Sequence, residues 1–281
     1  MAGFDINAVV NKAAKEGPNM NEAKKGGGGY KPPAEGVARA RFIGYIEGGE
    51  QEHNFQGAIS FKPKVKLIFE LSGPKWQPTK TEDGKLIPQR ITVTETLSLS
   101  EKAHFYKIFR SMNYDGEATH IAQLLGQDFR ITITHVKTKN GNIIALPKGR
   151  DGQYKIESPI YEDPESGEQK RVTADPQISE TRVFLWDYPS KEMWDSLFID
   201  GQYDEEKDDK GNVTRPAKSK NVLQEWIMGA KNWRDSEMYA ILNDGGSLDT
   251  GDIESNDDDA PWEKDEESKG AADEDPLAGV S

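Results

Sequence analysis

The chain has 281 residues, of which 30% are charged and 35% hydrophobic, and its formal net charge is −13. This length allows one large domain or two small ones. The absence of cysteine excludes disulfides, thiolate metal sites and cysteine nucleophiles. The first residues do not resemble a signal peptide and no apolar run is long enough to cross a bilayer, so we expect a cytoplasmic protein.

Charge is distributed unevenly along the chain. Residues 1–150 contain 22 Lys and Arg against 15 Asp and Glu, whereas residues 249–281 contain 2 against 13. The excess of acidic residues lies toward the C-terminus, whereas residues 1–150 carry a net positive charge. The negative net charge of the whole chain therefore does not argue against a polyanionic ligand for residues 1–150.

Residues 1–36 predict a flexible N-terminal arm. Phe4–Glu16 fits a short helix capped by Asp5, and Asn21–Pro33 is a Gly-rich run that ends in a Pro pair, which is typical of a linker. A helix of this length is too short to be stable alone. Order against a neighbouring protomer or DNA is the alternative to an unstructured arm.

Two predicted strands, Val37–Glu47 and Ser60–Leu71, each carry a basic and an apolar face, and the first is expected to end at Gly48-Gly49. Cations beside an aromatic ring form a candidate track for a phosphate backbone, with stacking for the bases. The alternative is that these charges only solvate an exposed sheet. The basic faces carry Arg39, Arg41 and Tyr45 on the first strand and Lys62, Lys64 and Lys66 on the second; the apolar faces carry Ala38, Ala40, Phe42 and Ile46, and Phe61, Val65, Leu67, Phe69 and Leu71.

A polar insertion, Lys75–Pro88, follows the second strand and precedes a third at Arg90–Leu99. It has a tight-turn signal at Asp83-Gly84. Trp76 in this insertion either covers the edge of a core or stacks on a base, and the neighbouring Lys75 and Arg90 favour the second role. We therefore include Lys75, Trp76 and Arg90 among the candidate DNA-binding residues.

The next segments predict helices and a closing hairpin. Ser98 and Glu101 have capping-box spacing before a helix over Glu101–Asn113, and Thr119 is expected to cap a second short helix. The strands Phe129–Val136 and Asn142–Leu146 are joined at an Asn140-Gly141 turn signal. Together these elements predict a mainly β fold with added helices (α+β), built on a small Greek-key barrel of the oligonucleotide-binding (OB) type within residues 37–248.

The second half predicts mostly helices. Strands are expected over Lys155–Tyr161 and Arg182–Trp186, and the charged stretch Tyr203–Lys220 is interpreted as a mobile loop. Three helices begin on a capping Ser, and their three tryptophans favour a core over a base-stacking platform. The helices are Ser190–Phe198, Ser219–Trp233 and Ser236–Asn243, with Trp194, Trp226 and Trp233.

Residues 249–281 predict a disordered acidic tail. The tail contains an acidic run followed by Pro and an aromatic ring. A tryptophan in such a tail has no core to join, so a partner pocket is its expected use. The candidate partner-binding residues are Asp257, Asp258, Asp259, Pro261 and Trp262.

The chain resembles phage-encoded single-stranded DNA-binding proteins in its tail hexamer Asp257–Trp262, its Tyr30–Gly49 stretch, its basic β core and its acidic tail. The resemblance implies a protein in the cytoplasm of a bacterial host. It would coat single strands in DNA replication, recombination and repair. Its tail would recruit a polymerase, helicase or nuclease, and self-association is left open.

Enzyme motifs are not found in the sequence. There is no P-loop and no G-x-S-x-G, and the four histidines show no metal-ligand spacing, so no cofactor is expected. The acidic cluster within residues 204–209 falls in the predicted loop, where a two-metal nuclease site would lack rigid support. We expect a non-catalytic single-stranded DNA-binding protein. The alternative is a structural or host-interacting phage protein, such as a virion component or an acidic DNA mimic.

Overall fold

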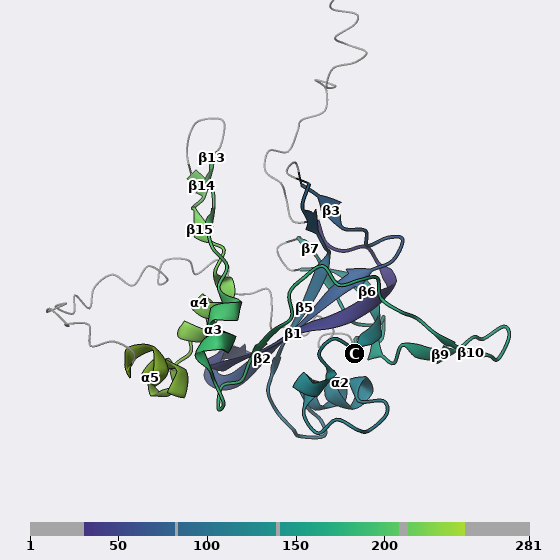
Figure 1. Ribbon diagram of the computed structural model, residues 1–281, viewed down its shortest axis with the longest axis horizontal. Coiled ribbons are helices and arrows are strands. Elements are labelled where there is room, and N and C mark those ends of the chain that lie inside the picture. The colour runs from purple at the N-terminus through teal and green to yellow at the C-terminus, as the bar shows by residue number, and fades with distance from the viewer. Residues whose placement is uncertain (1–30, 82–83, 139–140, 208–212, 245–281) are drawn as a thin grey trace, which may run out of the picture. The chain divides into compact units, whose positions relative to one another are not determined.

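The computed structural model describes residues 31–81, 84–138, 141–207 and 213–244 (Figure 1). The predictions for residues 1–30 and for the tail from Asp249 onward, Trp262 included, lie outside the described residues. Of the described residues, 32–201 and 219–244 belong to one compact unit, and Lys31 and 202–218 to a second. Strands dominate the larger unit, as predicted, and they also occur in the smaller unit, where the sequence indicated a mobile loop.

A mainly antiparallel sheet forms the centre of the larger unit, with the strand order β5-β2-β1-β6-β7. Two short strands join it: β8 pairs with β6, and β11 pairs with β1 in parallel. Among the described residues β5 and β7 are not paired, so the predicted barrel is not closed. The strands are β1 (Gly36–Phe55), β2 (Ala58–Ser72), β5 (Arg90–Thr96), β6 (Asp128–Lys137), β7 (Ile143–Leu146), β8 (Ile156–Glu157) and β11 (Arg182–Phe184).

A β-bulge interrupts the pairing of β1 with β2. Phe42 pairs with Phe69, and the next pair is Gly44 with Ile68, so Ile43 is an extra residue on β1. An extra residue in one strand moves every following side chain to the other face of the sheet. The alternation predicted for this strand is therefore correct only as far as Phe42.

The bulge divides the side chains of β1 between two cores. Ala38, Ala40 and Phe42 face the first core before it, and Tyr45 joins that same core after it. Ile46, predicted on the face of Phe42, packs instead in the second core. Each side of the sheet therefore carries apolar residues.

The strand does not end at Gly48-Gly49 as predicted, but continues to Phe55. A second register shift lies between Glu47 and Glu50, and Gly49 has a φ of 66°. The glycine pair thus forms an irregular step inside a long strand. Figure 1 shows the resulting β1–β2 ribbon.

The first core lies between the sheet, α2 (His104–Met112) and the 3₁₀ helix η1 (Ile121–Leu124). The capping box predicted at Ser98 and Glu101 is wrong, because α2 begins after Ala103, which makes no side-chain cap. The predicted cap at Thr119 is one residue early, because the side chain of His120 caps η1. The side chain of Gln123 in turn accepts a hydrogen bond from the backbone N–H of His120. The largest fully buried side chains here are Phe42, Tyr45, Leu67, Phe69, Ile108, Met112, Leu124, Phe129, Ile131 and Ile133.

The second core lies on the opposite side of β1, against α3 (Lys191–Leu197), α4 (Val222–Met228) and α5 (Glu237–Asp244). The core role predicted for the three tryptophans is confirmed: Trp194 is buried in this core, and Trp226 and Trp233 pack against it. Ser190 caps α3 as predicted, but α4 begins after Asn221 without a side-chain cap.

The remaining elements are short. In the larger unit, β3 (Thr79–Lys80) pairs with β4 (Leu86–Ile87), β9 (Ile160–Glu162) pairs with β10 (Gln169–Arg171), and η2 (Trp233–Asp235) precedes α5. In the smaller unit, β13 (Glu206–Lys207) pairs with β14 (Val213–Arg215), so part of the stretch interpreted as a mobile loop forms paired strands. The other short strands are β12 (Gln202–Tyr203) and β15 (Lys218–Ser219).

We predict that Gly48→Ala destabilises the protein by about 1–3 kcal/mol, the usual cost of overpacking. A methyl group at Gly48 would lie 2.3 Å from the ring of Trp226, which α4 packs against the ribbon. Urea unfolding measures the change. Gly229→Ala is the control, because a methyl group there meets backbone atoms at 3.4 and 3.5 Å. Equal stability of Gly48→Ala and wild type would contradict the packing.

Candidate nucleic-acid interface

The outer face of the sheet, opposite the first core, carries rows of charged side chains. Their arrangement follows from the register, because directly paired residues point to the same face. One row runs from Arg90 on β5 through Glu70 on β2 and Arg41 on β1 to Asp128 on β6; the next contains Ser72, Arg39 and Arg130.

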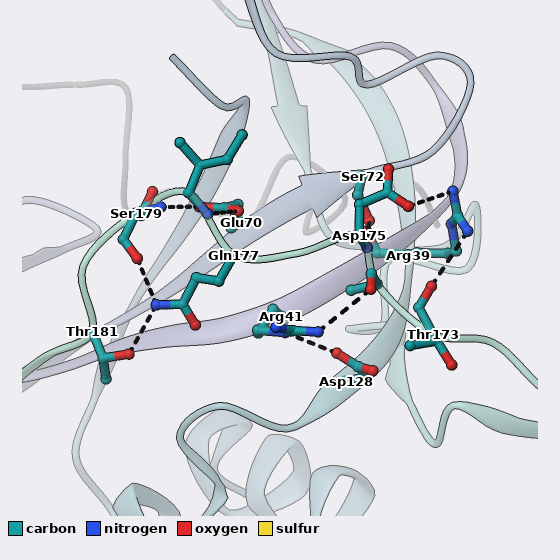
Figure 2. Close-up of polar contacts among 12 residues, drawn as sticks. Arg39, Arg41, Glu70, Ser72, Asp128, Thr173, Asp175, Gln177, Ser179 and Thr181 are labelled. Carbon is teal, nitrogen blue, oxygen red and sulfur yellow. Dashed lines mark hydrogen bonds and ion pairs between the residues drawn. The ribbon is translucent and has the colours of Figure 1, made fainter. Parts of the chain in front are cut away.

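An extended segment, residues 173–186, crosses this outer face and ends in β11 (Figure 2). We call it the strap. Arg39 forms an ion pair of 3.0 Å with Asp175 of the strap and donates to the carbonyl of Thr173. Arg41 forms an ion pair of 3.0 Å with Asp128 and donates to the carbonyl of Ala174. Two of the three arginines predicted to contact DNA, Arg39 and Arg41, are therefore engaged by acceptors within the protein.

Two side chains of β2 hold the strap in place. The carboxylate of Glu70, only 5% exposed, accepts hydrogen bonds of 2.8 and 2.7 Å from the backbone N–H groups of Ile178 and Ser179 (Figure 2). The hydroxyl of Ser72 accepts another from Asp175 N–H. A buried carboxylate must be hydrogen-bonded to be tolerated. The two N–H groups of the strap thus provide the hydrogen bonds that the buried carboxylate of Glu70 requires.

A second buried carboxylate, Glu47, joins the end of the strap to the first core. It accepts hydrogen bonds of 2.7 Å from the backbone N–H of Trp186 and from the hydroxyl of Tyr45. Burial raises the pKa of Tyr45 far above its ordinary value, and the negative charge of Glu47 raises it further. Tyr45 therefore remains a hydrogen-bond donor over the whole range in which proteins are handled.

The prediction that Tyr45 and Trp76 stack on bases is wrong. Tyr45 is fully buried because the bulge at Ile43 turns it into the first core. Trp76 is 4% exposed in the same core, and its indole N–H donates to the carbonyl of Ala34. The alternative for Trp76, that it covers the edge of a core, is correct.

The three lysines of β2 do not form an open basic track. Lys64 is 4% exposed, with its ammonium group 3.3 Å from Nδ1 of His53. The ammonium group of Lys66 lies 4.1 Å from the centre of the Trp226 ring of α4, and Lys62 is half-buried. The second core covers the face on which the sequence placed them.

Two predicted cations, Lys75 and Arg90, remain exposed. The ammonium group of Lys75 donates to the carbonyl of Glu35. Arg90 has no hydrogen bond or ion pair in the described part of the chain, although Glu70 lies directly across from it in the register. Among the nine predicted DNA-binding residues, Arg90 is the one best placed to take an external anion.

The ribbon end, formed by Phe55, Ile59, Phe61 and Lys231, presents rings and a cation that the sequence did not single out for binding. Phe55, Ile59 and Phe61 are 61%, 62% and 42% exposed. The ammonium group of Lys231 lies 4.5 Å from the centre of the Phe61 ring, and Lys231 N–H donates to the carbonyl of Glu50. The ribbon end is therefore an exposed apolar surface with a cation fixed beside it.

Sequence reasoning assigned Phe61 to the apolar core face, and its alternation does match that face. The first core ends at Val65, two positions past Pro63, so the same face is open to solvent at Phe61. Pro63 is the signal that could have marked this limit, because proline is unusual inside a covered strand. Lys231 could not have been found, because it lies 170 positions away in the sequence.

The described part of the chain offers no second candidate site for a nucleotide or a metal ion. A cavity of about 40 Å³ beside α2, lined by His104, Ser111 and Tyr154 among others, has room for water and not for a nucleotide. In the described ranges, no group of three or more acidic or histidine side chains could hold a metal ion, and no helix could span a membrane. Comparisons with family models, curated proteins and solved structures found no match to this chain.

We predict that Tyr45→Phe lowers stability at pH 9 by about 1–3 kcal/mol, because buried Glu47 loses a donor. The deficit should shrink by about 1.4 kcal/mol at pH 11. Tyr45 ionises near pH 10 when unfolded but at a higher pH when folded, so only the wild type loses this stability as the pH rises through 10. Urea unfolding at pH 9, 10 and 11 measures both values. A deficit that stays constant with pH would contradict the burial of this hydroxyl.

Proposed function

We propose that the protein is a non-catalytic single-stranded DNA-binding protein with an OB-like core, acting in phage DNA replication and recombination. The observation that carries this proposal is the ribbon end, where exposed aromatic rings lie beside a fixed cation. Sequence-tolerant single-strand binding requires this combination, because rings stack on any base while cations attract the backbone.

The order of the strands supports the OB-like core. The five strands of the main path come in the chain order β1, β2, β5, β6 and β7, and the helix α2 lies between the third and the fourth. In the sheet they stand third, second, first, fourth and fifth. A partly open five-stranded Greek-key barrel fits this arrangement.

The OB-like interpretation gives the ribbon end a definite role. OB folds bind oligonucleotides on the face of strands two and three and with the loops that join strands one to two and four to five. Here strands two and three are β2 and β5, and the first of those loops is the turn at Gln56 and Gly57 at the tip of the ribbon. The rings beside this loop and Arg90, which pairs with Glu70 near the other end of β2, therefore both lie on elements that OB folds use for binding.

The proposed DNA contacts differ from those that the sequence predicted. Because Arg39, Arg41, Lys64 and Lys66 have partners inside the protein, we propose that single strands contact the ribbon end and Arg90 in place of the predicted basic face. The recruiting role of the acidic tail stays a prediction from the sequence.

We predict tight binding to a fluorescent oligothymidine and much weaker binding to duplex of the same length. With about four to six phosphates contacted, log K against log salt should fall with a slope of roughly −3 to −4. An anisotropy titration between 50 and 300 mM NaCl measures both. Equal or tighter binding to duplex, or binding to neither, contradicts the proposal; the latter result would favour the structural or host-interacting alternative.

We predict that Phe61→Ala weakens oligothymidine binding by about 5- to 100-fold, since one stacked base contributes about 1–3 kcal/mol. The thermal midpoint should change little, because Phe61 is 42% exposed. Tyr114→Ala is the matched control: Tyr114 is 38% exposed and lies just beyond Asn113, the C-cap of α2, which packs on the first core. If both variants bind like wild type, the ribbon end does not stack on bases.

A further inference from the structure

Two arginines on the outer face of the sheet lack an anionic partner. Arg90 is exposed on β5, and Arg182 is half-buried on β11, at the end of the strap. Neither guanidinium group makes a hydrogen bond or an ion pair within the residues that the structure describes. A guanidinium removed from water without a carboxylate or carbonyl partner is unusual, because its desolvation is then not offset.

The register places Arg182 and Arg90 on one side of the sheet. Arg182 pairs with Gly44, Gly44 with Ile68, and Ile68 with Thr92 on β5, two positions from Arg90. Gly44 contributes no side chain to this row, so the half-buried Ile68 is the only side chain that stands between Arg182 and Thr92 in the register. The Arg182 side chain can therefore extend over the sheet toward Arg90.

Electrostatics agree with this placement. Burial lowers the pKa of Arg182, the charge of Glu180 raises it, and the nearby charge of Arg90 lowers it again. The carboxylate that faces Arg90 in the register, Glu70, is already used by two N–H groups of the strap. In the described part of the chain no carboxylate lies within ion-pair distance of either guanidinium, so the two cations can still attract an external anion.

We propose that Arg90 and Arg182 together bind one phosphate group of a single-stranded nucleic acid. Two guanidinium forks match the tetrahedral oxygens of a phosphate, and the exposed Thr92 adds a hydroxyl in the same row. This inference rests on the proposed function and adds a defined backbone contact to the base-stacking surface of the ribbon end.

The test measures oligothymidine binding against salt for Arg90→Gln, Arg182→Gln and the double variant. Each single variant should bind about tenfold more weakly, as expected for the loss of a charged hydrogen bond. The salt slope of the double variant should be shallower by about 0.7, the value for one phosphate. The double variant should bind no more than about twofold more weakly than the weaker single variant, because both arginines hold the same group.

Arg110→Gln is the matched control, an exposed arginine on α2 that should bind and respond to salt as wild type does. The thermal midpoint of each variant shows whether it folds. If Arg182→Gln does not fold, Arg90→Gln, at an exposed position, and Arg182→Lys, which keeps the charge, still test the phosphate site. Arg182→Lys should show the same salt slope as wild type, because it keeps the charge, but it should bind oligothymidine more weakly than wild type. Unchanged affinity and slope in all the variants would overturn the phosphate site and leave the proposed function standing.

Inorganic phosphate distinguishes the source of the anion. At equal ionic strength, 10 mM phosphate should raise the thermal midpoint of wild type by less than a saturating oligonucleotide does. If phosphate alone protects wild type but not Arg90→Gln, and oligonucleotide affinity is the same in both, the site takes free phosphate and the inference is wrong. If wild type binds no oligonucleotide, both the proposed function and this inference fall.

Discussion

The structure depends on one strand, β1, which serves two hydrophobic cores at once. Its bulge at Ile43 turns Tyr45 into the first core and Ile46 into the second. The step at Gly48-Gly49 then makes room for the rings that α4 and the strap bring against it. Because a one-residue change in register exchanges the two faces of a strand, neither core could form on a regular β1.

The two buried carboxylates Glu47 and Glu70 explain how the outer face is organised. Glu70 accepts two backbone N–H groups at the middle of the strap, and Glu47 accepts the N–H of Trp186 at its end together with the hydroxyl of Tyr45. The strap is therefore fixed at its middle and its end by hydrogen bonds that would be costly to leave unmade. The strap in turn gives Arg39 and Arg41 their acceptors. What remains for an external ligand is the ribbon end and, on the outer face near the other end of β2, Arg90 with Arg182.

The sequence predicted where the main strands lie, but it did not predict which of their faces are covered by other parts of the chain. The alternation in β2 correctly placed Leu67 and Phe69 in a core, because the extra residue of the bulge lies on β1 and not on β2. Tyr45 was misplaced because a bulge leaves no mark in local alternation. The lysines of β2 were taken as open because nothing near Lys66 in the sequence indicates Trp226, which covers it from 160 positions away. Local patterns identify which face is basic; only the tertiary structure decides whether that face is exposed.

The central claim is that a single strand of DNA contacts the ribbon end. Photocrosslinking with an oligonucleotide carrying 5-iodouracil tests it most directly, because the modified base couples to aromatic rings on which it stacks. After trypsin digestion, Phe55 and Phe61 both fall in the peptide of residues 42–64, since Pro63 blocks cleavage at Lys62. We expect the main adduct on this peptide, at Phe55 or Phe61. Adducts confined to other peptides would contradict the account.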